Sequence, residues 1–196
     1  MTSGSLLARD KTAWTGVPDA VSPDATSSNG TGSAVFRVVT RRGDFGDVDV
    51  RFTLVNDRFV TTRRTPARAF DGVHVLLRYA SAQRLYAVSV NRRDGRVIVK
   101  KKEPGGPSNG GTYFDLTPAV RFPFSFHRPQ AIEVRVENAL DGSVVIVLRS
   151  GGRLVLTAVD RGLGGPPLTA PGKVGIRGDN DEFSFDDFTV TPLAPT

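Results

Sequence analysis

The chain has 196 residues, of which 39% are hydrophobic, and this is enough apolar surface for one sizeable core. It contains no cysteine, which excludes disulfide bonds, thiolate metal sites and cysteine nucleophiles. The net charge of +6 comes from 26 basic and 20 acidic residues. Because the basic residues are scattered and no recognition helix is evident, nucleic acid is not an expected partner, whereas an acidic polysaccharide remains possible.

The first 33 residues differ in composition from the rest of the chain. They are rich in Ser, Thr, Gly, Pro and Asp, and Trp14 is their one large apolar side chain. We expect an extended arm over residues 1–33 that can contribute one edge strand, followed by a single domain over residues 34–196.

From Ala34 onward, apolar and polar residues alternate with a period of two. The run 48–54 shows this pattern first, and the runs 73–79, 86–90, 132–136 and 154–158 repeat it. Val144–Leu148 is apolar on both faces, which predicts a central strand covered on each side. Since 25 Val residues stand against four Glu and five Lys, and no run keeps a 3.6-residue period, we predict an all-β fold with minimal helix.

Short glycine-containing pairs separate several of these runs. Asp94-Gly95, Asp141-Gly142 and Gly151-Gly152 supply the positive φ angles that tight hairpin turns require. Two insertions, 57–70 and 103–129, interrupt the regular spacing. Long loops in a compact β domain are either functional or mobile.

The last strand of the chain contains a break in its pattern. Phe183 and Phe185 share one face of a regular strand, whereas Phe188 and Val190 fall on the other. All of these residues face one core only if a β-bulge inserts an extra residue at 186–187. A bulge that carries two carboxylates predicts a calcium site, with Asp187 and Asp186 as ligands. The alternative is that these carboxylates only form hydrogen bonds with the N-terminal arm.

Several segments together resemble a known superfamily. They are Gly46–Phe52, Asp71–Tyr79, Leu85–Val90, Pro171–Arg177 and Phe183–Val190. This pattern resembles the concanavalin A-like lectin/glucanase superfamily, and within it the laminin-G-like jelly-roll modules found beside bacterial glycosidases, including the DUF1080 group. The resemblance covers about residues 34 to 191. It implies a two-sheet antiparallel sandwich, a concave face that often meets sugar, a frequent calcium ion and an extracellular location, but no single activity.

The strand predicted over residues 73–79 suggests a binding surface. If its apolar residues, Tyr79 included, face the core, His74 and Arg78 share the opposite face. The neighbouring runs add polar side chains to this face. The expected strip consists of His74, Arg78, Ser89, Asn91, Lys100 and Lys102. Its charge and hydrogen-bonding groups suit an anionic sugar, although outward residues of this kind are also ordinary solvent-facing positions.

Motifs of known enzymes are weak in this chain. Glu133 and Glu137 share a strand face, as the paired carboxylates of glucanases do, but Arg135 lies between them and would keep both ionised, which does not suit a general acid. The motif strings of alginate lyases are absent, and so are nucleotide-binding motifs.

We therefore favour a non-catalytic, lectin-like carbohydrate-binding module, with an acidic polysaccharide as a candidate ligand. A polysaccharide lyase or glycoside hydrolase of the same fold is the first alternative, and a protein-interaction domain is the second. No apolar run approaches the ~20 residues of a membrane span, and no signal peptide is evident, so only the resemblance suggests an extracellular location.

Overall fold

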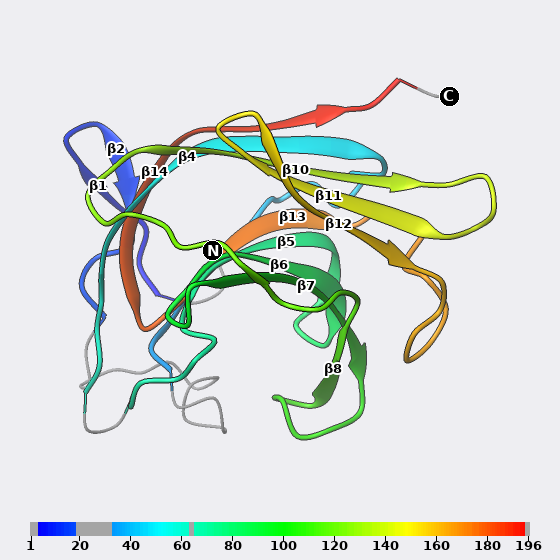
Figure 1. Cartoon of the computed structure of the whole chain (residues 1–196), viewed down its shortest axis with the longest axis horizontal. Helices are drawn as coiled ribbons and strands as arrows, with labels where there is room; N and C mark the ends of the chain where they lie inside the picture. The colour runs from blue at the N-terminus through cyan, green and yellow to red at the C-terminus, as the bar shows by residue number, and fades with distance from the viewer. Residues whose placement is uncertain (1–3, 19–32, 63–64, 195–196) are drawn as a thin grey trace.

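Two antiparallel sheets of seven strands each lie face to face in the computed structural model (Figure 1). The structure describes residues 4–18, 33–62 and 65–194, and none of these residues is helical. This part of the chain therefore contains no helix that could cross a membrane. The predicted all-β sandwich is confirmed.

The two sheets are named here after one of their central strands. The β4 sheet consists, in spatial order, of β1 (Leu7–Arg9), β2 (Thr12–Trp14), β14 (Asp181–Pro192), β4 (Val48–Phe59), β10 (Gln130–Asn138), β11 (Val144–Ser150) and β12 (Arg153–Asp160). The β5 sheet consists of β3 (Val35–Val39), β13 (Lys173–Asp179), β5 (Gly72–Ser81), β6 (Arg84–Arg92), β7 (Arg96–Pro104) and β8 (Gly111–Asp115), and β9 (Val120–Arg121) also pairs with β7.

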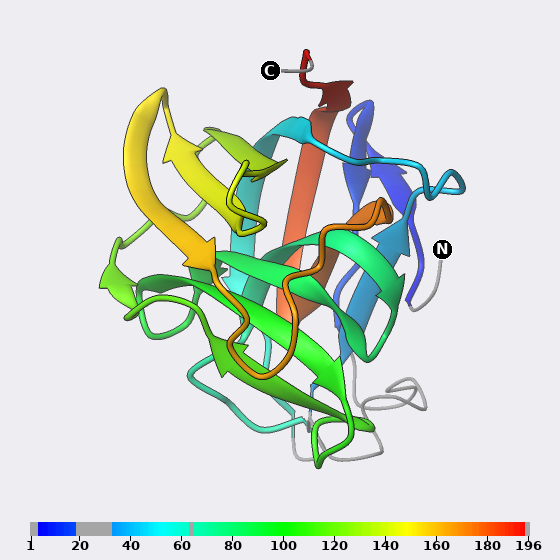
Figure 2. The ribbon, with the colours of Figure 1, turned by 90° about the vertical axis from the view of Figure 1, so that its right-hand side faces the viewer.

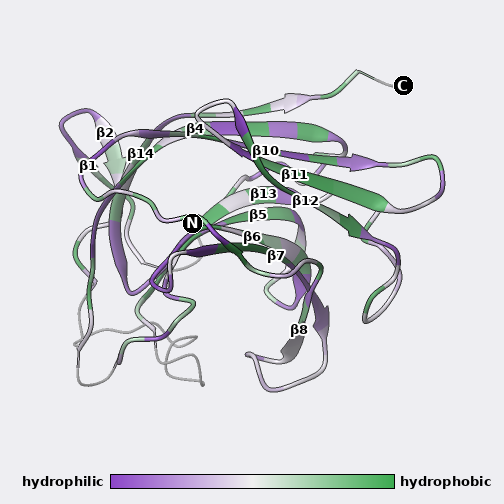
Figure 3. Ribbon diagram, viewed as in Figure 1, coloured by the Kyte–Doolittle hydropathy of each residue, from purple (hydrophilic) through white to green (hydrophobic). Residues whose placement is uncertain are grey.

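The core lies between the sheets and follows from the period-two alternation. Along β4, Val50 and Phe52 are buried, whereas Arg51 between them is exposed. Val50 lies directly opposite Val134 of β10, so the apolar residues of neighbouring strands meet on the same face. The same alternation of apolar and hydrophilic residues is visible along the strands in Figure 3.

Strand β11 differs from the sequence-based expectation. It lies next to the edge strand β12 rather than at the centre of its sheet. Ile146 and Leu148 are buried in the core, but Val145 and Val147 on the other face are only half-buried. The expectation of a strand covered on both sides is therefore wrong, because a branched apolar residue tolerates a partly exposed position.

The predicted hairpin turns are confirmed. Gly151 and Gly152 join β11 to β12 with φ angles of 54° and 77°, and a side chain at either position would strain the backbone. Asp94-Gly95 and Asp141-Gly142 lie in the β6–β7 and β10–β11 connections, where both glycines also have positive φ.

The predicted bulge in the last strand is also confirmed. Between the paired residues Asp186 and Thr189, β14 holds one residue more than the facing segment of β4. Asp187 takes a left-handed φ of 53° at this point. As a result, Phe185 and Phe188 both pack on the core, with ring centroids 6.1 Å apart.

The N-terminal arm supplies two short strands rather than one. Strands β1 and β2 form a hairpin, and β2 pairs with β14 where Trp14 lies opposite Ser184. Residues 1–3 and 19–32 of the arm lie outside the described residues, so the expected boundary between arm and domain stays a prediction.

Candidate functional site

A cavity of about 420 Å³ lies on the outer face of the β5 sheet. Strands β13, β5, β6 and β7 form its floor, with His74, Leu76, Ser89 and Lys100 pointing outward. One wall comes from β8 and the loop that leads into it, which belong to the second predicted insertion. Figure 2 shows these strands after a 90° turn of the molecule about the vertical axis.

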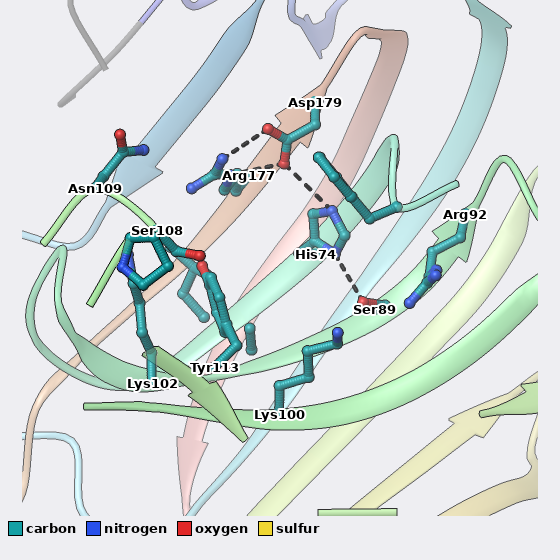
Figure 4. Close-up of a pocket in the computed structure, with 14 residues that line it drawn as sticks. His74, Ser89, Arg92, Lys100, Lys102, Ser108, Asn109, Tyr113, Arg177 and Asp179 are labelled. Carbon is teal, nitrogen blue, oxygen red and sulfur yellow. Dashed lines mark hydrogen bonds and ion pairs between the residues drawn. The ribbon is translucent and has the colours of Figure 1, made fainter. Parts of the chain in front are cut away.

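A row of hydrogen-bonding side chains crosses the floor of the cavity (Figure 4). His74 on β5 lies directly opposite Ser89 on β6, and its Nδ1 is 2.9 Å from the Ser89 Oγ. On its other side, the Nε2 of His74 is 3.3 Å from the Oδ2 of Asp179 on β13. All three residues are more than nine-tenths buried, so their mutual geometry is held by the surrounding sheet.

Asp179 is fixed from two directions. Arg177, two residues earlier on β13, donates two hydrogen bonds of 2.7 Å to its carboxylate. The turn that follows is anchored because the Asn180 side chain donates a 3.1 Å hydrogen bond to Asp71. Burial alone would raise the pKa of the Asp179 carboxyl, but Arg177 and His74 outweigh this effect and hold that pKa well below its usual range. Asp179 is therefore a fixed anion.

Basic side chains surround this row. Arg92, Lys100, Lys102 and Arg177 line the cavity, and Asp179 is the single carboxylate among its lining residues. Lys100 is 3.1 Å from Asp115, and Arg92 forms a 2.6 Å ion pair with Asp94. With these two partners counted, four cations face three carboxylates, so the cavity keeps a small excess of positive charge.

Lys102 is held differently from Lys100. Its ammonium donates a 2.8 Å hydrogen bond to the carbonyl of Ala82 and lies 5.0 Å from the ring centroid of Tyr113. Burial, with the nearby positive charges of Arg177 and Arg37, lowers the pKa of Lys102 to about 8. The charge in this part of the cavity therefore depends on pH near neutrality.

The structure brings part of the predicted strip together. His74, Ser89, Lys100 and Lys102 all line the cavity. Two other predicted members, Arg78 and Asn91, do not, and each is displaced by a β-bulge.

Arg78 lies at an irregularity near the end of β5. Between Leu76 and Tyr79, β5 holds one residue more than the facing segment of β13, and Arg78 takes a φ of 49°. Tyr79 consequently packs on the outer face with Leu76, although the sequence suggested a core position. The expectation that Arg78 shares the face of His74 is wrong, because the bulge turns its buried side chain to other partners. These are Asp47 Oδ1 at 2.7 Å, Asn138 Oδ1 at 3.2 Å and Thr169 O at 3.0 Å.

Asn91 follows a second bulge. Asn91 pairs with Val73 and Ser89 pairs with His74, so β6 holds the extra residue Val90 between them. Residues directly opposite share a face, and Val73 belongs to the core. Asn91 is therefore turned inward and is only 1% exposed, which corrects its predicted outward position.

The predicted calcium ligands lie away from the cavity. Asp186 and Asp187 are both exposed, and the Asp187 backbone N–H donates a 2.8 Å hydrogen bond to Asp186 Oδ1. Within the described ranges, no group of three or more His, Cys, Asp or Glu side chains could hold a metal ion. Two exposed carboxylates supply few of the 6–8 oxygen ligands that calcium takes, and calcium stays a prediction.

The paired glutamates lie on the other sheet, and Glu133 forms ion pairs there. Glu133 is 3.4 Å from Arg51 and 3.8 Å from Arg149, whereas Arg135 donates to Asp49 at 3.0 and 3.1 Å. This arrangement favours the solvated strand face over a pair of catalytic carboxylates.

Four residues on which the site depends were not found by sequence reasoning: Arg92, Tyr113, Arg177 and Asp179. Tyr113 belongs to the aromatic, β-forming run 112–114, which was a usable strand signal inside the insertion. Asp179 and Arg177 occupy alternate positions of a strand two places away from Ser89 in the sheet, and no local pattern predicts their contact with His74.

Comparisons with known proteins agree with this architecture. No protein-family model matches the chain, and no curated protein matches its sequence. Among solved structures, the carbohydrate-binding module CBM66 from Bacillus subtilis has a TM-score of 0.58 at 12% identity, over 80% of this chain and 81% of that one. A Bacillus subtilis protein of unknown function with a galectin-like fold also has a TM-score of 0.58 at 12% identity, over 99% of this chain and 88% of that one.

The exoplasmic/lumenal domain of VIP36, in a form bound to Ca²⁺ and Man3GlcNAc, has a TM-score of 0.59 at 10% identity, over 99% of this chain and 83% of that one. At these identities the likeness shows the fold alone. The chain has the galectin-like sandwich of the concanavalin A-like jelly rolls. The finer resemblance to laminin-G and DUF1080 modules stays an expectation.

Proposed function

We propose that this domain is a lectin-like module that binds an acidic polysaccharide in the cavity on the outer face of the β5 sheet. The observation that carries the proposal is the lining of that cavity, where four basic side chains accompany one carboxylate. Two of the similar structures are described as a carbohydrate-binding module and as a domain bound to an oligosaccharide. These descriptions support a sugar as the ligand.

The floor suits a ligand with many hydroxyl groups. Ser89 offers a hydroxyl oxygen that is already held in place by His74, which Asp179 holds in turn, so little side-chain freedom is lost when a ligand binds. Beside them, Leu76 and Tyr113 offer apolar surface. Sites that combine apolar walls with a few fixed polar groups are typical of small-ligand pockets, and their volumes are ~300–1,000 Å³.

The charge of the cavity favours an anionic sugar over a neutral one. Lys100 is about one-quarter exposed and its partner Asp115 more than half exposed, so this surface ion pair is weak and the ammonium can also bind a carboxylate or sulfate on the ligand. Arg92, which also lines the cavity, already binds the Asp94 carboxylate through its Nε and Nη2, so it adds positive charge to the cavity rather than a free two-pronged donor.

A matched pair of ligands tests this proposal. We would compare a galacturonate oligosaccharide with its methyl ester by isothermal titration calorimetry, because the two differ in charge but little in shape. The free acid should bind about tenfold more tightly or better, which corresponds to ~1.4 kcal/mol. Lys100→Gln should remove much of this difference, whereas Arg149→Gln on the other sheet should leave it unchanged.

If the two ligands bind equally well, the acidic preference is wrong. If a panel of neutral and acidic glycans shows no binding at all, a protein-interaction domain becomes the better account.

A further inference from the structure

Ser89, His74 and Asp179 lie in the order of a nucleophile, a base and an orienting carboxylate, and we propose that they hydrolyse acyl esters on a sugar held in the cavity. This activity goes beyond the binding function proposed above. Its substrate class rests on that function, whereas the hydrolytic chemistry rests on the three side chains alone.

The direction of each hydrogen bond follows from Asp179. Its carboxylate is ionised and can only accept, so the Nε2 of His74, at 3.3 Å, must carry the ring hydrogen. A neutral imidazole has one N–H, which makes the Nδ1 an acceptor. In this neutral form, the Ser89 hydroxyl, 2.9 Å away, donates a hydrogen bond to Nδ1. This is the arrangement in which a base activates a serine.

The ring nitrogens have exchanged the roles that they have in serine proteases, where Nε2 faces the serine and Nδ1 the aspartate. Either nitrogen of a neutral imidazole can accept a proton when the other carries the hydrogen. The chemistry is therefore the same, and what matters is that the three groups remain aligned.

The alignment is supported beyond the three residues. Arg177 holds the Asp179 carboxylate through two hydrogen bonds, and the β-sheet register places His74 directly between Arg177 and Ser89 on neighbouring strands. Ser89 is 3% exposed, yet it lines the cavity, so a ligand would meet its hydroxyl where bulk water is largely excluded.

Lys100, whose ammonium also pairs with Asp115 at 3.1 Å, brings a positive charge toward the serine. Figure 4 shows the Lys100 side chain reaching toward Ser89 from β7. An ammonium in this position would stabilise the negative charge that develops on the carbonyl oxygen of an ester under attack. A cavity of about 420 Å³ accommodates a sugar ring with a small acyl group such as acetyl.

The reaction balances with water as the second reactant. The Ser89 Oγ attacks the acyl carbon as its proton passes to His74, and the bond from that carbon to the sugar oxygen breaks. The sugar oxygen takes the proton from the imidazolium and leaves as a hydroxyl. Water then attacks the acyl-serine with His74 again as base, which releases the carboxylic acid and restores the Ser89 hydroxyl.

A fluorophosphonate probe tests the nucleophile without any sugar. The probe forms a P–O bond with an activated serine and releases fluoride, and the adduct is located by peptide mass mapping. We expect one adduct, on Ser89. It should be absent from Ser89→Ala and retained in Ser125→Ala, which alters an exposed loop serine. The proposal would be overturned if the protein stays unlabelled while trypsin, the positive control, is labelled. An adduct on another serine would overturn it as well.

Acetate release tests the reaction itself. With p-nitrophenyl acetate and with acetylated galacturonate oligosaccharide, Ser89→Ala should lower the initial rate by about 100-fold or more. Equal rates in the parent and Ser89→Ala would overturn hydrolysis at Ser89. If no labelling occurs but glycans bind, this proposal fails and the binding function stands. If Ser89 is labelled and cleaves the simple ester but no glycan binds, the catalytic part stands and the carbohydrate part fails.

Discussion

Lys101 and Asp160 form an ion pair from which solvent is completely excluded: the Nζ lies 2.9 Å from Oδ2, and both side chains are 0% exposed. The Tyr86 hydroxyl donates a 2.6 Å hydrogen bond to the same carboxylate, and the Lys101 ammonium also donates to the Gly165 carbonyl at 2.7 Å. Lys101 lies between Lys100 and Lys102 but points into the sandwich, because successive residues of a strand face opposite sides. This contact ties β7 to β12 and to the loop after β12.

Removing one partner of this pair should destabilise the fold strongly. Lys101→Met leaves the Asp160 carboxylate buried without its cation, and we expect a loss of ~3–5 kcal/mol in the free energy of unfolding. Urea denaturation measures this loss. Lys173→Met, at a half-buried lysine of β13, serves as the control and should change the free energy far less. A loss below ~1 kcal/mol for Lys101→Met would contradict the ion pair as a fixed element of the fold.

Acidic ligands should bind less well as the pH rises through 8. The lowered pKa of Lys102 means that its ammonium is charged below about pH 8 and neutral above it. A bound anion favours the charged form, so the midpoint in the complex should lie above 8. Affinity measured by calorimetry from pH 7 to pH 10 should therefore decline. Lys102→Arg, whose charge persists throughout this range, should remove the decline, and an unchanged decline would assign it to another group.

Arg78 should contribute to stability and not to binding. Its side chain is 1% exposed and pairs with Asp47 at 2.7 Å, away from the cavity. Arg78→Met leaves its polar partners without a cation and should cost ~2–4 kcal/mol in urea denaturation. The dissociation constant of the folded variant for an acidic glycan should stay within about twofold of the parent value. A stable variant with weakened binding would instead place Arg78 in the binding site.

The bulge at Asp187 should tolerate glycine better than a branched residue. Because Asp187 has a φ of 53°, Asp187→Val should lower the free energy of unfolding by ~1–2 kcal/mol, whereas Asp187→Gly should leave it nearly unchanged. Thermal melting with added calcium and with chelator shows whether the position also binds the ion. A chelator-sensitive melting temperature that becomes insensitive in Asp187→Gly would establish a calcium site there, because an ion bound only by the folded state stabilises it.

The bulges show which parts of the structure the sequence reveals. The bulge at 186–187 is predictable because apolar residues lie on both sides of it. The spacing of Phe185 and Phe188 shows that the alternation of apolar and polar residues shifts by one position between them. At Val90 no apolar run follows in the strand, since Asn91 and Arg92 fit either face. At Arg78 the following residue is Tyr79, whose ring packs in a core or on a half-exposed face equally well.

The candidate site was predictable to a similar extent. His74, Ser89 and Lys100 were found because cross-strand neighbours on consecutive hairpins follow from local patterns. Asp179 was not found, because β13 follows both hairpins and β12 in the chain and pairs with the much earlier β5. The register of such a distant pairing leaves no local signal in the sequence. The hydrogen-bonded row of Ser89, His74 and Asp179 can therefore be recognised only in the folded structure.

The location of the ligand is the central claim, and an NMR titration with galacturonate oligosaccharide tests it most directly. We expect the largest shifts at the backbone amides of His74, Ser89 and Lys100 on the outer face of the β5 sheet, and at Tyr113 in the wall. Amides at Val145 and Val147, on the outer face of the β4 sheet, should not move. Shifts confined to the β4 sheet, or no shifts at a ligand concentration that saturates binding in calorimetry, would contradict the account.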